Sequence, residues 1–166
     1  IKNNEIAILY RTNSQSRIFE EYLRRYNIGY KVFGGLSFYQ RKEVKDLIGY
    51  LRLTINKRDE EALKRVLNYP RRGIGKTTID KISALAGETG KTMWEGLQLV
   101  KVSARAATAI NNFVKAIMNF TRKAEGSNAY EVAIHVAKNS GLIAEMQKDN
   151  SLEWLGRIEN VNALLD

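Results

Sequence analysis

The chain has no cysteine, and only one proline and one histidine among its 166 residues. Without cysteine it can form no disulfide framework and no thiolate site, which fits a reducing compartment, and we expect a cytoplasmic protein. No apolar run approaches the ~18 residues of a membrane span and no signal peptide opens the chain, so we expect no membrane contact. The lone His135 stands among aliphatic residues without clustered carboxylates. We expect this histidine to have a packing or hydrogen-bonding role, and we expect no metal site.

Two stretches imitate the end of a nucleotide-binding P-loop. Residues 75–77 and 90–92 both read Gly-Lys-Thr, but the first glycine of the pattern G-x-x-x-x-G-K-[ST] is replaced by Pro70 and Leu85. The acidic run at 59–61 follows a polar stretch and predicts a helix cap with an acidic first turn. We therefore expect no catalytic residue and no cofactor within this chain.

The charge is strongly positive and unevenly placed. The formal net charge is +9. Residues 1–83 hold 18 Lys and Arg against 9 Asp and Glu, whereas residues 84–166 hold 9 of each. An excess confined to one half indicates a polyanionic partner such as nucleic acid, although a generally basic protein would show the same total.

A glycine-rich stretch between two helical patterns, at residues 60–67 and 78–85, organises this basic half. Gly73 and Gly75 can adopt positive φ and carry no Cβ, so a phosphate can approach the backbone N–H groups of the turn and of the following helix. The neighbouring side chains add positive charge, hydroxyl donors and a helix cap. The stretch resembles a helix-hairpin-helix element, which binds the backbone of duplex DNA. A glycine helix stop followed by a capped helix would need no ligand.

The first residues predict a strand, a helix and a second strand. Residues 5–10 and 30–33 are short, apolar and β-branched, and an amphipathic helix lies between them. We expect a small βαβ piece of an α/β lobe over residues 1–33, cut from something larger because its parallel strands need more sheet. Gly34 and Gly35 predict a hinge between this piece and a second domain, residues 34–166.

The second domain predicts a mainly α fold, a helical bundle with short connections. Apolar residues at helical spacing predict helices over about 41–55, 103–124, 128–137 and 151–165. Helix starts are predicted at caps, which are Asp59, Thr92, Ser103 and Asn128.

Other polar residues leave two interpretations open. Arg11 and Asn13 follow the first predicted strand, where a guanidinium and an amide suit a phosphate or a base. They would equally serve as an ion-pair partner and a helix cap. Tyr69 flanks basic residues and could stack on a base or pack in the core, and Arg41 and Lys42 are candidate additional DNA contacts.

Five segments, in order and spacing, resemble UvrD/Rep/PcrA-type DNA helicases of superfamily 1. They are residues 6–17, 30–35, 38–46, 50–53 and 68–78. The resemblance is strong across residues 1–83 and weaker beyond about residue 90. It implies that residues 1–33 open the second RecA-like motor lobe, and that residues 34–166 are most of the helical accessory domain inserted into it.

The resemblance also implies roles for single residues. It assigns contact with the translocating single strand to Arg11, Thr12 and Asn13. It assigns duplex backbone contacts, in a sequence-independent manner, to Arg71, Arg72, Gly73, Ile74, Gly75, Lys76, Thr77 and Thr78. The parent protein would use ATP and Mg²⁺ to unwind DNA, while this part should be inactive alone. Expected partners are DNA, the rest of the helicase chain, and repair or replication proteins.

An alternative is a self-sufficient DNA-binding or protein-docking module that uses the hairpin without motor activity. The predicted βαβ start separates the two hypotheses, because an independent module has no reason to begin with two strands that lack a sheet. We therefore favour the helicase.

Overall fold

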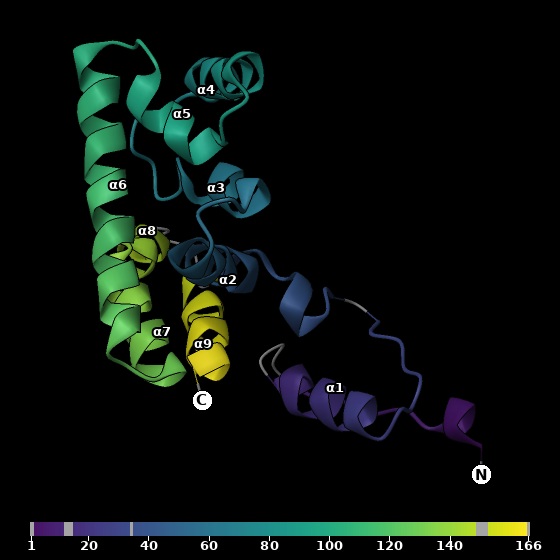
Figure 1. Cartoon of the computed structure of the whole chain (residues 1–166). Coiled ribbons are helices and arrows are strands. Elements are labelled where there is room, and N and C mark those ends of the chain that lie inside the picture. The colour runs from purple at the N-terminus through teal and green to yellow at the C-terminus, as the bar shows by residue number, and fades with distance from the viewer. Residues whose placement is uncertain (1, 12–14, 34, 149–152, 166) are drawn as a thin grey trace. The chain divides into compact units, whose positions relative to one another are not determined.

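A computed structural model of the chain describes residues 2–11, 15–33, 35–148 and 153–165. Over these residues the fold is mainly helical, as expected (Figure 1). The α-helices are α1 (Ser16–Arg25), α2 (Lys42–Ile55), α3 (Glu60–Val66), α4 (Lys76–Thr89), α5 (Met93–Leu99), α6 (Ala104–Glu125), α7 (Ala129–Asn139), α8 (Leu142–Gln147) and α9 (Glu153–Leu165). Among them we find none with the length and apolar character of a membrane span.

The predicted βαβ piece is wrong for the described residues. Residues 6–10 and 28–33 flank α1 as irregular chain, and the structure shows no strand in the ranges that it describes. A strand is held by hydrogen bonds to a neighbouring strand, and the described residues provide none to pair with. Most apolar side chains of these segments are accordingly exposed, with Leu9 94% and Phe33 78% exposed, while Ile28 and Val32 are half-buried. The β propensity of these residues is local, whereas a sheet is a non-local property, so composition alone did not decide the structure.

The chain divides into two compact units, which we describe separately. One comprises residues 1–45 and 149–166, and the other residues 46–148. Of the two residues predicted as a hinge, Gly34 lies outside the described residues and Gly35 lies in an exposed bend. The predicted domain boundary between residues 33 and 34 stays a prediction.

The first unit is organised by a buried carboxylate on α1. Glu20 is 2% exposed. Its Oε1 accepts the hydroxyl of Ser16 (2.9 Å) and the backbone N–H of Phe38 (3.0 Å), and its Oε2 accepts the hydroxyls of Ser37 and Tyr30. Burial raises the pKa of this carboxyl, but the hydrogen bonds from Ser37, Phe38 and Ser16 outweigh it and hold the pKa below the ordinary value.

Arg41 is the second buried charge of this unit. Only 6% of it is exposed. Its Nη1 donates to Oδ1 of Asn160 on α9 (2.6 Å), its Nη2 donates to Oγ of Ser16 (2.8 Å), and its guanidinium lies 5.4 Å from the ring centre of Phe38. Asn160 in turn donates to Glu43. Arg41, a candidate DNA contact in the sequence, therefore joins α1 to α9 inside the protein.

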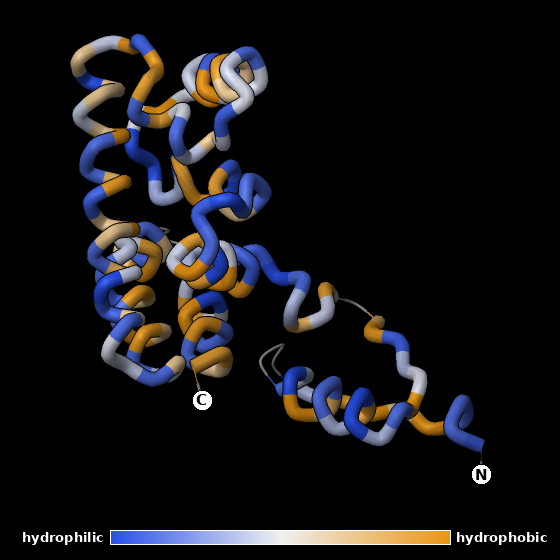
Figure 2. Tube along the Cα trace, in the orientation of Figure 1, coloured by the Kyte–Doolittle hydropathy of each residue, from blue (hydrophilic) through white to orange (hydrophobic). Residues whose placement is uncertain are grey.

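The second unit is a helical bundle built along α6. In Figure 1, α5 lies near the start of this long helix and α7 beside its end, and α6 packs against α7 while α4 packs against α5. Apolar residues recur at every turn of α6 (Figure 2). Its buried side chains are Ala106, Ile110, Phe113, Ile117 and Phe120. Burying each of the large ones contributes about 1.5–3 kcal/mol to folding.

Four helix starts in this unit carry the caps that the sequence predicts. Side chains of Asp59, Thr92, Ser103 and Asn128 accept N–H groups in the first turns of α3, α5, α6 and α7. At Thr92 the capping box with Glu95 is complete. Each cap contributes about 1 kcal/mol, so these four boundaries are fixed by local sequence.

The carboxylate of Glu20 should make the first unit sensitive to acid. Because its pKa is lower in the folded chain, Glu20 stabilises the fold above its ordinary pKa of 4.5, and this contribution is lost as the pH falls through the folded-state pKa. We expect Glu20→Gln to lower the unfolding free energy by about 2 kcal/mol at pH 7, since the carboxylate accepts several buried hydrogen bonds. Urea titrations between pH 3 and pH 7 would measure this.

The matched control is Glu21→Gln on the same helix, because the side chain of Glu21 is 42% exposed and pairs with Arg17. Glu21→Gln should lower the free energy of unfolding by no more than about 0.5 kcal/mol. Equal losses in the two variants would contradict the buried role of Glu20.

Candidate nucleic-acid interface

The predicted hairpin connects the end of α3 at Val66 to the start of α4 at Lys76. Gly73 has φ +79°, a left-handed conformation that favours glycine. Gly75 has φ −73° and ψ 169° and is the N-cap of α4. Positive φ is thus needed at one glycine only, and the space around Gly75 is open, with no atom within 4 Å of where its Cβ would stand.

One amide side chain holds the turn in shape. Oδ1 of Asn68 accepts the backbone N–H groups of Arg72 (3.0 Å) and Ile74 (3.1 Å). The side chain of Ile74 is completely buried. Ile74 was a predicted DNA contact, but its side chain anchors the turn in the core and its N–H is already used.

Arg72 faces the interior rather than the solvent. Its Nη1 donates to the carbonyl oxygens of Val66 (3.0 Å), Leu67 (3.3 Å) and Pro70 (3.1 Å). Its Nη2 donates to the hydroxyl of Tyr50 and to the carbonyl of Ser140 (3.3 Å). The guanidinium therefore supplies donors to the carbonyls at the end of α3, and that of Val66 also accepts the backbone N–H of Tyr69 (3.2 Å).

Two aromatic rings enclose this guanidinium. Its carbon lies 5.2 Å from the ring centre of Phe113 and 5.9 Å from that of Tyr50. Burial raises the pKa of Tyr50 to about 12, so its hydroxyl stays protonated and donates to the carbonyl of Tyr69 (2.7 Å). Cation–π contact in a partly desolvated setting adds about 1–2 kcal/mol. Arg72 thus ties the hairpin to α2 and α6.

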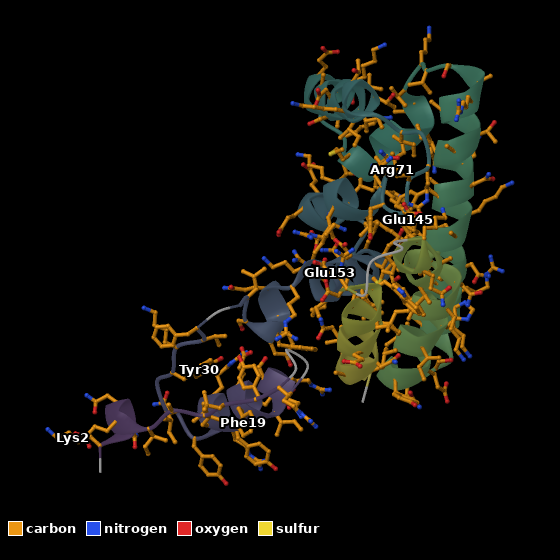
Figure 3. All side chains as sticks on the ribbon, turned by 180° about the vertical axis from the view of Figure 1, so that it is seen from behind. Lys2, Phe19, Tyr30, Arg71, Glu145 and Glu153 are labelled. Atoms are coloured by element: carbon orange, nitrogen blue, oxygen red, sulfur yellow. The ribbon has the colours of Figure 1, made fainter. Side chains whose placement is uncertain are left out.

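The junction of α7 and α8 supports the other side of the hairpin. Gly141 has φ +83°, and a Cβ there would lie 3.3 Å from Cγ of Pro70, so the backbone passes close to the proline ring. Glu145 lies next to Arg71 (Figure 3) and accepts its backbone N–H. Hydrogen bonding from Lys148 is the main cause that lowers the pKa of this carboxyl, and the Arg71 N–H contributes. The hairpin is therefore braced by residues remote in sequence.

The face of the hairpin that is left uncovered is basic and rich in donors. Gly73, Gly75, Lys76 and Thr77 are exposed. The carbonyl of Gly75 receives the N–H groups of Thr78 (3.0 Å) and Ile79 (3.2 Å), which closes the first turn of α4. Within the part of the chain that the structure describes, the N–H groups of Gly75, Lys76 and Thr77 reach no protein acceptor.

Free N–H groups at a helix start, together with the positive end of the helix dipole, bind anions. The ammonium group of Lys76 adds a full positive charge at the same place. Arg71, also in the hairpin, is exposed as well. This uncovered surface, formed by Arg71, Gly73, Gly75, Lys76 and Thr77, is called the hairpin face below.

The remaining predicted residues are spread over the chain. Arg11 and Lys42 are exposed and Tyr69 is half-buried, while Thr12 and Asn13 lie outside the described residues. No cluster of metal-binding side chains occurs in the described ranges. Asn68 and Tyr50, which shape the hairpin, were missed. Asn68 could have been suspected because a short amide before a turn often bonds backbone ahead of it, whereas nothing local marks Tyr50.

We expect Arg72→Lys to lower the free energy of unfolding by about 2–4 kcal/mol. A lysine cannot span five acceptors or stack between two rings, so several of these part-buried acceptors would lose a donor. Urea denaturation followed by circular dichroism measures the change.

Arg71→Lys is the matched control, one residue away and exposed. It should stay within about 0.5 kcal/mol of the wild type. Indistinguishable midpoints for the two variants would show that Arg72 does not hold the hairpin.

Comparisons of the sequence with those of known proteins identify its family. The family model of the UvrD-like helicase C-terminal domain matches residues 1–165. The chain is 36% identical over 167 aligned residues to the ATP-dependent DNA helicase PcrA of Bacillus subtilis, an alignment that covers 99% of this chain and 23% of that protein. Its identity to the proteins of the same name from Staphylococcus aureus and Staphylococcus epidermidis is 34% and 35%, with the same shares covered.

The chain thus spans about a quarter of the length of these relatives. The match to the family model covers nearly all of the residues described above, including both compact units and the complete hairpin. This chain belongs to the UvrD-like helicase C-terminal domain family.

Proposed function

We propose that this chain is the DNA-engaging part of an ATP-dependent DNA helicase, and that it holds duplex DNA by its backbone through the hairpin face. The observation that carries the proposal is the exposed start of α4, where three N–H groups without protein acceptors lie beside Lys76. Membership of the helicase family and the names of the relatives support it.

The proposed ligand atoms are phosphate oxygens. Backbone N–H groups and a lysine ammonium bind phosphate through charge and hydrogen bonds, and neither reads a base. The turn around Gly73 and Gly75 has no side chain to obstruct an approaching phosphate. Binding should therefore be independent of sequence, as a motor that passes along DNA requires.

Of the predicted duplex contacts, the proposal retains those on the hairpin face, together with the half-buried Thr78 that follows it. The side chains of Arg72 and Ile74 are engaged inside the protein. Their contribution is to fix the shape of the turn, and the phosphate contacts come from their neighbours.

Arg11 is proposed as a contact for the single strand. It is exposed at the end of the first irregular segment, and its backbone N–H donates to Oε1 of Gln15 (3.0 Å). The predicted companions Thr12 and Asn13 belong to the same proposal.

ATP hydrolysis and translocation are proposed for the whole helicase rather than for this chain. The relatives are named ATP-dependent, and the chain corresponds to 23% of their length. The sequence lacks a complete P-loop, because Pro70 and Leu85 stand at the required glycine positions. ATP and Mg²⁺ would accordingly bind to other residues of the parent protein.

We expect Gly75→Val to weaken duplex binding about tenfold while the fold is kept. The side chain has room in the protein, but it would stand between a phosphate and the N–H groups of α4. Fluorescence anisotropy with a labelled duplex at ~0.1 M salt measures the affinity. Gly87→Val is the control, since Gly87 is an exposed glycine with open surroundings later in the same helix. Equal affinities in a folded Gly75 variant and its control would refute the contact.

We expect Lys76→Ala to weaken binding alike for all duplex sequences. Loss of one phosphate contact should reduce the slope of log K against log salt by ~0.9. Lys81→Ala removes the same charge from an exposed site on the same helix and should leave the slope nearly unchanged. A loss that depends on sequence would indicate base readout instead.

We expect Arg11→Ala to weaken binding of a labelled single strand and to leave duplex affinity unchanged within about twofold, because one exposed guanidinium contributes about one phosphate contact. Arg25→Ala, an exposed arginine at the end of α1, is the control. Equal losses of affinity for single-stranded and duplex DNA would show that Arg11 contributes only to a general positive charge.

A further inference from the structure

An arginine from a distant part of the sequence lies beside the hairpin turn. A Cβ built on Gly73 would stand 3.8 Å from Nε of Arg105, and no other heavy atom comes within 4 Å of it. Arg105 belongs to the first turn of α6 (Ala104–Glu125). Its guanidinium therefore borders the hairpin face at the one residue that has a left-handed backbone.

The position of Arg105 is fixed by the fold. Ser103 caps α6 by accepting the N–H of Ala106 (3.4 Å), which sets where the helix begins. Further along the same helix, Phe113 lies against the Arg72 guanidinium (5.2 Å). The hairpin is thus joined to α6 through Arg72 and Phe113, and the same helix carries Arg105, whose Nε lies close to Gly73.

The charge of Arg105 is not used inside the protein. Arg105 is exposed, and among the described residues no hydrogen bond, ion pair or ring contact engages it. The only acidic residue of α6 is Glu125, at the opposite end of the helix. An exposed guanidinium without an internal partner, next to the turn that leads into the basic start of α4, favours an anion at this surface.

We propose that Arg105 is a second basic contact of the hairpin face and binds a phosphate of the same duplex from α6. This inference rests on the proposed function, and it adds a residue from another helix to that surface. A guanidinium can bind two oxygens of one phosphate at once, so it positions the backbone more tightly than a lysine. With Lys76 at the start of α4, the two side chains would flank the exposed turn from two helices.

The test uses the 166-residue chain and a labelled duplex of mixed sequence, with anisotropy titrations over a range of salt. Arg105→Ala should weaken binding about five- to tenfold at ~0.1 M salt and reduce the salt slope by ~0.9, as for one lost phosphate contact. Arg105→Lys keeps the charge, so it should keep the slope and lose affinity by less than about threefold.

Arg122→Ala is the matched control. It removes the same side chain from an exposed position of the same helix, about 25 Å away along the axis at ~1.5 Å per residue. It should change affinity by less than about twofold. Thermal unfolding of each variant, expected to match the wild type because both arginines are exposed, shows that lost binding is not lost fold.

The outcomes separate the two proposals. If Arg105→Ala and Arg122→Ala bind alike while Lys76→Ala and Gly75→Val are weakened, the role of Arg105 is wrong and the hairpin function stands. If the wild-type chain shows no salt-dependent duplex binding, both are wrong. If Arg105→Lys loses as much slope as Arg105→Ala, the side chain does not act through its charge and the inference is overturned.

Discussion

The hairpin depends on the guanidinium of Arg72. In the connection between α3 and α4, one side chain with five donors bonds the carbonyls of Val66, Leu67 and Pro70. The same group reaches Ser140 and the hydroxyl of Tyr50. Buried carbonyls without donors would each cost about 1–3 kcal/mol. Arg72 therefore stabilises the turn that leads into α4, and the N–H groups at the start of that helix are the ones that helix geometry leaves without partners.

Much of the helical fold could be predicted because its determinants are local. The caps at Asp59, Thr92, Ser103 and Asn128 and the apolar periodicity of α6 lie within a few residues of the structure they specify. The site was only partly predictable. A sequence shows that Arg72 is charged, but its side chain also bonds acceptors on α2 and at the α7–α8 junction, which only the fold brings to it. Arg105 carries no local signal at all, since only tertiary packing brings it to Gly73.

The predicted strands that did not form also show that local sequence does not determine non-local contacts. Residues 6–10 have the composition of a strand, yet a strand needs a partner, and the described residues do not supply one. This removes the observation that had separated a helicase part from an independent module. The family match across residues 1–165 now carries that distinction. The composition of a segment shows that it can form a strand, but it becomes one only when a neighbouring strand forms hydrogen bonds with it.

Net charge alone overstates the surface that can meet DNA. A cation releases counterions from DNA only if it is free to approach a phosphate. Arg41 is engaged in buried hydrogen bonds and Arg72 in part-buried ones, and Arg65 pairs with Asp46 (3.0 Å). Lys76 and Arg105 have no such internal partner among the described residues. The two kinds of basic residue are complementary. The internally bonded arginine shapes the turn. The cations without internal partners would then bind DNA more tightly, because a fixed surface loses less entropy when it binds. Basic residues whose side chains bond acceptors inside the protein should therefore be set apart before the remaining ones are assigned to a ligand.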